Sequence, residues 1–144
     1  MKTWLKIFLA VIIIGIIGVV LVYKFVYNKP HTDYSTANAA YTLNVRELFD
    51  AYIASPDTAM KKYNGQIIEL KGTPDKIEIT DSLVIAVFVF KQGEFGDEGV
   101  RCTMLREYNE AAKKQKPGSI IRVKGYCTGF SGDVILEKCS ILNP

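Results

Sequence analysis

An apolar run near the N-terminus constrains this chain more than any other feature. Ile7 to Tyr23 (IFLAVIIIGIIGVVLVY) are seventeen consecutive residues without a charge. As a helix rising about 1.5 Å per residue, the run is roughly 26 Å long, close to the hydrocarbon thickness of a bilayer. Trp4, Tyr23 and Tyr27 lie where interfacial aromatic residues are enriched. The run therefore predicts a transmembrane anchor over residues 7–27, after a basic flank over residues 1–6.

The alternative to a permanent anchor is a cleaved signal peptide, which also combines a basic start with an apolar middle. The run is long for such a segment, and it ends at Tyr23-Lys24-Phe25, where no small-x-small cleavage site follows. The nearest small residues, Ala37 to Ala40, come too late in the chain. We therefore expect the helix to stay in the mature protein.

The charges that flank the run bear on its orientation. Lys2, Lys6 and the α-amino group precede it, and Lys24 and Lys29 follow it. The excess of positive charge on the N-terminal side is small, and it favours an N-terminus inside the cell. We expect a single-pass protein whose domain lies on the extracytoplasmic side of the membrane.

Residues 28–42 are polar and small and are typical of a flexible tether, which leaves residues 43–144 for the folded domain. His31, the one histidine of the chain, lies in this tether, where solvation is the expectation. From Pro30 onward the chain has fourteen basic and fifteen acidic residues. A domain that binds polyanions usually has a clear basic excess, so this balance argues against nucleic-acid binding, except through a local basic patch.

The domain is expected to begin with helices. Asn44 and Glu47 have the spacing of a capping box, and an amphipathic stripe follows. We expect this stripe to pack on a sheet, with a partner's groove as the alternative. Ser55-Pro56 predicts the start of a second short helix that ends before Asn64-Gly65. The stripe consists of Val45, Leu48, Phe49, Tyr52 and Ile53.

Five strands are expected after these helices, with one short helix among them. Gly72 predicts a bend in the first strand, and residues 91–98 (KQGEFGDE) are expected to be an exposed loop. Ser131-Gly132 predicts a hairpin between the last two strands. The expected strands are 66–79, 83–90, about 100–104, 119–130 and 133–142, and the helix is 106–116. Five strands with a helix between the third and fourth predict a closed OB-fold barrel, in a mainly β domain.

The domain resembles the tRNA anti-like family of OB-fold domains, which are small membrane-tethered or lipoprotein-like bacterial proteins. The resemblance rests on VRELFDAY (45–52), AMKKYNGQIIELKG (59–72), PGSIIRVKGYCTGF (117–130) and DVILEKC (133–139). It extends from Val45 to Ile141, or about 100 residues. It implies an OB barrel in the bacterial envelope, anchored to the cytoplasmic membrane, and a nucleic-acid-binding ancestry. It implies no catalytic residue.

Three cysteines occur, Cys102, Cys127 and Cys139, at spacings that match no common zinc site. A simple hairpin register places Cys127 near Leu136 and Cys139 near Lys124. In an OB barrel the third strand neighbours the fifth, so a Cys102–Cys139 disulfide is the easier bridge. Three buried thiols without a bridge are the alternative. A redox role is the weaker idea, because the chain lacks a CxxC pair.

We find no catalytic constellation, because the single histidine lies in the tether. The sequence therefore predicts a non-enzymatic protein without a metal or cofactor. A ligand is expected on the second and third strands and their loop, as in other OB folds. Single-stranded nucleic acid would need aromatic and basic side chains together there. The candidates are Phe88, Phe90, Lys91, Phe95, Arg101 and Thr103.

Two hypotheses follow from these expectations. The first is a membrane-anchored interaction module for a protein, peptide or glycan ligand. The second is a single-stranded nucleic-acid-binding domain. Two alternatives to ligand binding stay open for these candidates. Phe88 and Phe90 could pack in the core, and Lys91 and Arg101 could be solvated.

Overall fold

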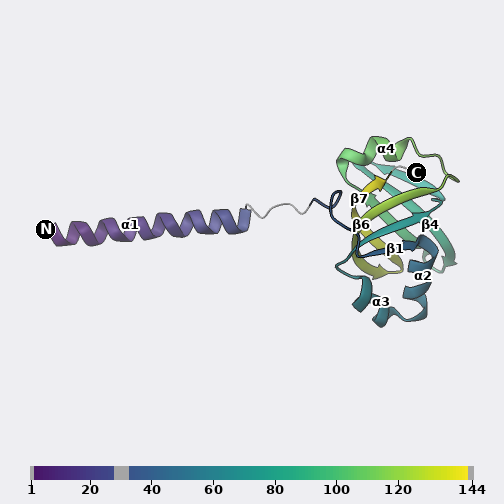
Figure 1. Ribbon diagram of the computed structural model, residues 1–144, viewed down its shortest axis with the longest axis horizontal. Helices are drawn as coiled ribbons and strands as arrows, with labels where there is room; N and C mark the ends of the chain where they lie inside the picture. The colour runs from purple at the N-terminus through teal and green to yellow at the C-terminus, as the bar shows by residue number, and fades with distance from the viewer. Residues whose placement is uncertain (1, 28–32, 143–144) are drawn as a thin grey trace. The chain divides into compact units, whose positions relative to one another are not determined.

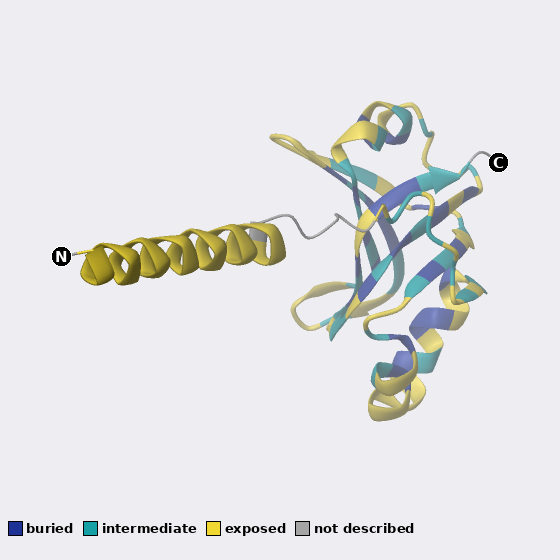
Figure 2. Cartoon of the chain, turned by 60° about the vertical axis from the view of Figure 1, so that its left-hand side comes forward, coloured by how far each residue is buried: buried dark blue, intermediate teal, exposed yellow. Residues whose placement is uncertain are grey.

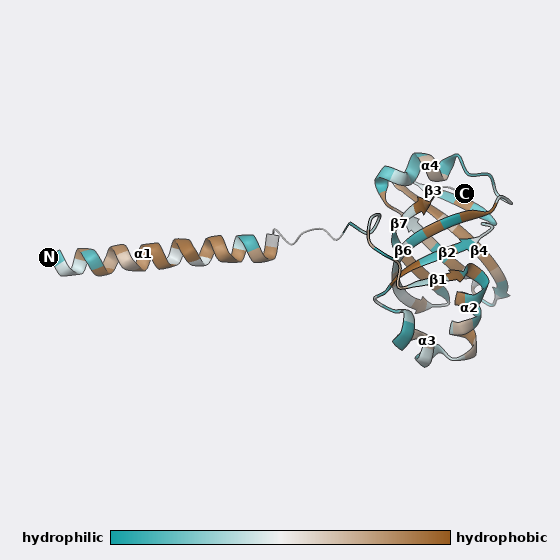
Figure 3. Ribbon diagram, viewed as in Figure 1, coloured by the Kyte–Doolittle hydropathy of each residue, from teal (hydrophilic) through white to brown (hydrophobic). Residues whose placement is uncertain are grey.

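The computed structural model describes residues 2–27 and 33–142, which belong to two compact units divided after Thr32. The first unit is helix α1 (Lys2–Val22), which continues as a π-helical turn, η1 (Tyr23–Tyr27) (Figure 1). After Lys2 and Lys6 in its first turns, helix α1 is apolar around its circumference (Figure 3), and it contains no buried residue. In the described part of the chain, it is the one helix that is long and apolar enough to cross a membrane. His31 and the rest of residues 28–32 lie outside the described residues.

The second unit begins with strand β1 (Tyr41–Asn44) and two short helices, α2 (Val45–Ala54) and α3 (Pro56–Tyr63). The predicted capping box is confirmed. The Arg46 backbone N–H donates to Asn44 Oδ1 at 3.0 Å, and the Asn44 backbone N–H donates to Glu47 Oε2 at 2.9 Å. Both bonds satisfy donors that a helix start would leave unpaired.

Seven strands form one mixed sheet in the order β1-β2-β6-β7-β5-β4-β3. The pairs β1–β2 and β5–β7 are parallel, and the other pairs are antiparallel. Between β5 and β6 the chain forms a 3₁₀ turn, η2 (Arg106–Tyr108), and helix α4 (Asn109–Lys113). The strands are β2 (Ile67–Gly72), β3 (Lys76–Thr80), β4 (Leu83–Gly93), β5 (Gly96–Met104), β6 (Ile121–Ser131) and β7 (Asp133–Leu142).

The described residues form seven strands, and their hydrogen-bonded order runs from β1 to β3 without closing, so the expected five-stranded closed barrel is not confirmed. The expected first strand, residues 66–79, is divided into β2 and β3. Pro74 lies at the break, where it has no N–H to donate to a ladder. The additional strand, β1, includes Tyr41 and Thr42 from the expected tether, and it pairs with β2.

The expected loop at residues 91–98 is also wrong, because β4 and β5 continue through most of it as a hairpin. Lys91 pairs with Glu98 and Gln92 with Asp97 after a bulge between Val89 and Lys91. Opposite charges on facing residues stabilise a strand pair. The prediction considered only the polar residues and glycines of this segment, which are typical of a loop. The hairpin between β6 and β7 is confirmed at Ser131-Gly132.

The core is formed by the inward side of the sheet together with helices α2, α3 and α4. Figure 2 shows buried residues in both the strands and the helices of this unit. Four of the five stripe residues on α2 are buried, which confirms that this stripe packs on the sheet. Ile53 is the exception, at 46% exposed. The largest buried side chains from the sheet include Phe88, Ile68, Leu70, Ile121 and Leu136.

A substitution of Gly99 tests how closely the backbones of β4 and β5 approach each other. A Cβ at this position would overlap the carbonyl oxygen of Phe88, which is backbone and cannot rotate away. We expect Gly99→Ala to lower the free energy of unfolding by roughly 3 kcal/mol or more. Urea unfolding of the full chain in detergent micelles, followed by circular dichroism, measures this loss.

Gly93→Ala is the matched control in the same hairpin. Its Cβ would meet only the side chain of Glu98, which can move to another rotamer. Equal losses in the two variants would contradict the close backbone approach at Gly99.

Candidate ligand-binding face

The six predicted ligand residues do not form one surface. Phe88 is 1% exposed and belongs to the core. Phe90 is half-buried, with its ring 5.5 Å from that of Phe49 and the Arg46 guanidinium 5.1 Å above it. Both phenylalanines therefore pack within the domain, and neither is a free stacking platform.

The other four candidates are accessible. Arg101 and Thr103 lie two residues apart on β5, so they share its outward face and are partly exposed. Lys91 is exposed on β4, and Phe95 is fully exposed in the turn between β4 and β5. The structure thus places two candidates on the sheet and two on the projecting hairpin.

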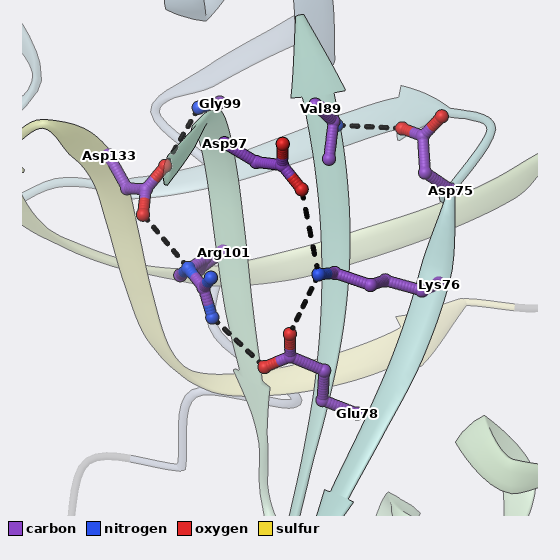
Figure 4. Close-up of polar contacts among 8 residues, drawn as sticks. All are labelled: Asp75, Lys76, Glu78, Val89, Asp97, Gly99, Arg101 and Asp133. Atoms are coloured by element: carbon purple, nitrogen blue, oxygen red, sulfur yellow. Dashed lines mark hydrogen bonds and ion pairs between the residues drawn. The ribbon is translucent and has the colours of Figure 1, made fainter. Parts of the chain in front are cut away.

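Arg101 lies at the centre of a charge network on the outward side of β3, β4 and β5 (Figure 4). Its Nε donates to Asp133 Oδ2 at 2.8 Å and its Nη1 donates to Glu78 Oε2 at 3.0 Å. Lys76 Nζ lies 3.2 Å from Glu78 Oε1 and 3.7 Å from Asp97 Oδ2. We call these five residues, Lys76, Glu78, Asp97, Arg101 and Asp133, the compensated face.

Two aspartates in this region, Asp133 of the network and Asp75 beside it in the sequence, bind main-chain N–H groups. Asp133 Oδ1 accepts a hydrogen bond from the Gly99 N–H at 2.7 Å, while its other oxygen binds Arg101. Asp75 Oδ2 accepts from the Val89 N–H at 2.7 Å. These carboxylates satisfy the backbone N–H groups of Gly99 and of Val89, which lies at the bulge in β4. They therefore have a structural role as well as an electrostatic one.

The network shifts the acid–base behaviour of its members. Partial burial raises the pKa of Glu78, but the hydrogen bond from Lys76 and the charge of Arg101 outweigh this, and the pKa lies below its ordinary value. Partial burial lowers the pKa of Arg101, but its bonds to Asp133 and Glu78 outweigh this and raise it. Each partner therefore favours the charged form of the other.

The cations of this region are paired with carboxylates. Lys91 also has a partner, with its Nζ 3.6 Å from Glu98 Oε2. A phosphate that approached Arg101, Lys76 or Lys91 would have to displace a carboxylate from the protein. The compensated face therefore suits a neutral or mixed-charge ligand better than a polyanion.

Sequence reasoning identified Arg101 but missed its two carboxylate partners, Glu78 and Asp133, on other strands. Lys76 and Glu78 alternate along β3, which indicates a shared face. The contact of Glu78 with Arg101 depends on the register of β3, β4 and β5, and Asp133 reaches Arg101 through the parallel β5–β7 pair. Neither relation is visible in the local sequence.

The three cysteines are buried with free thiols. Cys127 pairs with Leu136, as expected, while Lys124 faces Ser140 and not Cys139, because bulges shift the β6–β7 register. Burial raises the pKa of the Cys139 thiol well above its ordinary value, and the neighbouring Cys102 thiol raises it further. The Cys102–Cys139 disulfide stays a prediction.

Cys127 belongs to a separate buried contact. The Tyr52 hydroxyl donates to Asn64 Oδ1 at 2.6 Å and lies 3.3 Å from Cys127 Sγ. Burial raises the pKa of Tyr52, and the contact with Cys127 raises it further. Within residues 2–27 and 33–142, no three His, Cys, Asp or Glu side chains are grouped so that they could hold a metal ion.

Comparison with known proteins identifies the family. The tRNA_anti-like family model matches residues 1–141, and the chain belongs to this family. Comparison with curated protein sequences finds no significant match.

Two solved structures are similar to this chain. The first is a candidate nucleic acid-binding lipoprotein from Klebsiella pneumoniae, with a TM-score of 0.51 and 18% identity over 71% of this chain and 91% of that one. At this identity the likeness shows the fold alone. A candidate aspartyl-tRNA synthetase from Leishmania major has a TM-score of 0.45 and 14% identity, over 74% of this chain and 22% of that one. The second likeness is too weak to support an argument.

Glu78 makes the compensated face sensitive to acid. Because its pKa is lower in the folded state, its stabilising effect is present above the ordinary value of 4.5 and is lost as the pH falls through the folded value. We expect Glu78→Gln to cost up to about 1 kcal/mol at neutral pH, as is usual for a partly exposed pair. The difference from the wild type should shrink in acid.

Urea unfolding of the full chain in micelles at neutral and acidic pH measures this difference. Glu94→Gln is the matched control, because Glu94 is exposed in the β4–β5 turn and the described residues give it no ion-pair partner. If Glu94→Gln and Glu78→Gln show the same pH dependence, the network is not responsible.

Proposed function

We propose that this protein is a membrane-anchored, non-catalytic binding module whose domain is an OB barrel on the extracytoplasmic side of a bacterial cytoplasmic membrane. The observation that carries the proposal is helix α1. None of its 21 residues is buried, and from Ile7 to Val22 it presents an apolar surface on every side. A helix of this kind is stable in hydrocarbon but exposes a large apolar area to water. Lipid is therefore its best environment.

The strand connections support the OB barrel. β2 and β3 are far apart in the strand order, yet only residues 73–75 separate them in the chain. Taken as one bent strand, they make five strands with β4, β5, β6 and β7, and α4 lies between the third and fourth. This is the order of an OB fold, and β5–β7 is its parallel closing pair. β1 then extends one side of the barrel as an additional edge.

The hairpin and the compensated face support a protein, peptide or glycan as the ligand. Phe95 is fully exposed at the tip of the β4–β5 hairpin, where an aromatic ring can stack on a sugar or pack against a side chain. The neighbouring charges are paired, so they can form directional polar contacts without attracting polyanions strongly. Thr103 adds a hydroxyl on the same strand as Arg101.

Single-stranded nucleic acid is the second candidate ligand. Its support is the family to which the chain belongs and the name of the Klebsiella pneumoniae protein, a candidate nucleic acid-binding lipoprotein. Against it are the acidic balance of the domain and the pairing of Lys91 and Arg101 on the expected ligand strands. Salt-sensitive binding of labelled single strands would favour this candidate.

A topology experiment tests the anchored module. We expect the full chain, produced in a bacterium, to stay in the membrane fraction after alkaline carbonate washing. A periplasmic reporter enzyme fused after Pro144 should be active, and a cytoplasmic reporter at the same position should not. Recovery of the chain in the soluble fraction would reject the anchor. Activity of the cytoplasmic reporter alone would reverse the orientation.

A further inference from the structure

A second outward surface, formed by β2, β6 and β7, differs in charge from the compensated face. Lys71 faces Arg122 across β2 and β6, Glu69 faces Lys124, and Ile67 faces Tyr126. Residues two apart on a strand share a face, so Arg122, Lys124 and Tyr126 follow one another at about 7 Å intervals along β6. The register therefore arranges basic and aromatic side chains in a row.

Tyr34 and Lys138 extend this row. The Tyr34 ring packs edge-on against the Tyr126 ring, with 5.6 Å between centroids, and Lys138 Nζ lies 4.7 Å from the centre of the Tyr34 ring. Lys138 reaches this position from a bulge in β7, where its φ is +54°. We call the six residues Tyr34, Lys71, Arg122, Lys124, Tyr126 and Lys138 the basic face.

Most of the cations on the basic face lack a carboxylate partner. Arg122 is paired with Glu69. Among the described residues, no acidic side chain forms an ion pair with Lys71, Lys124 or Lys138. On the compensated face, by contrast, both cations are paired. Three lysines are therefore available to bind an external anion.

We propose that the basic face docks on the anionic lipid headgroups of the membrane that holds helix α1. This inference rests on the proposed function, because it requires the anchor. Tyr34 belongs to the basic face and is the second residue of the folded unit. Only residues 28–32 separate η1 from Asp33, so the connection can extend at most roughly 20 Å. The chain thus enters the domain at the surface that we assign to lipid.

The number of free lysines favours lipid over nucleic acid. Each lysine close to an anionic leaflet favours the bound state about five-fold, so three favour it roughly a hundred-fold. That is sufficient for a domain whose tether already holds it at a high effective concentration near the lipid. A nucleic acid must bind from bulk solution, where three phosphate contacts give weak, salt-sensitive binding. Tyr34 and Tyr126 also suit an interface, because each has an apolar ring and a polar hydroxyl.

Lysine footprinting of the full chain in vesicles tests the proposal. The chain is reconstituted in neutral phosphatidylcholine vesicles or in vesicles that also contain phosphatidylglycerol, and a membrane-impermeant amine reagent is applied. We expect Lys71, Lys124 and Lys138 to be labelled several-fold more slowly in the anionic vesicles than in the neutral ones. High salt should remove this protection. Lys76 and Lys91, on β3 and β4, are internal references in the same molecules and should not change.

Charge-reversal variants give a second measurement. Lys71→Glu combined with Lys124→Glu should abolish the protection of Lys138 in anionic vesicles. Lys61→Glu combined with Lys116→Glu changes the net charge equally at exposed positions that do not belong to the basic face, and Lys138 should stay protected. Loss of protection in both variants would mean that net charge matters and the basic face does not, which would overturn the proposal.

The remaining outcomes separate this proposal from the proposed function. Vesicle flotation first shows whether the chain is anchored. A chain that does not float rejects the anchor, whereas a chain that floats but shows equal labelling in both vesicles rejects only the docking. If a single-stranded oligonucleotide protects the three lysines in neutral vesicles and anionic lipid does not, the face binds nucleic acid, and the lipid proposal is wrong.

Discussion

The parallel pairing of β5 with β7 is the contact on which the rest of the domain depends. Each of these strands also belongs to an antiparallel hairpin, β4–β5 or β6–β7, so their pairing joins two local units into one sheet. The paired residues Val100 and Val134 are completely buried, as are Cys102 and Leu136. Without this pair the inward sides of the hairpins would expose apolar surface, and helix α2 would have no complete surface on which to pack.

The same pairing also organises the outward charges. Asp133 begins β7 and binds both the Gly99 N–H and the Arg101 guanidinium of β5, so one carboxylate supports the strand pair and neutralises the main cation of the face. Farther along β6 and β7, Lys124 and Lys138 form no ion pair with a carboxylate of the described residues. A domain with almost no net charge can therefore have two surfaces of different character, which its composition does not reveal.

Much of the fold could be predicted because the relevant signals are local. The Asn44–Glu47 cap, the stripe on α2 and the turn at Ser131-Gly132 each depend on residues close in sequence, and all three are confirmed. The bend expected at Gly72 lies where β2 ends, but the strand break at Pro74 and the continuation of the hairpin beyond Phe90 were missed. Both features depend on residues from another strand. The Val89 N–H donates to the Asp75 carboxylate across the sheet, and Lys91 faces Glu98. The candidate site was predicted less well, because a phenylalanine in an apolar strand can point to either side.

By itself, the sequence determined the apolar α1 helix, the amphipathic α2 helix and most of the strands, because helix length, apolar periodicity and turn residues act over a few positions. It also determined the near-neutral charge of the domain. Only the tertiary structure decided that Phe88 is in the core, that Arg101 is held by Asp133 and Glu78, and that Tyr34 meets Tyr126. These contacts join residues 23 to 92 positions apart, and strand register, not local sequence, brings them together.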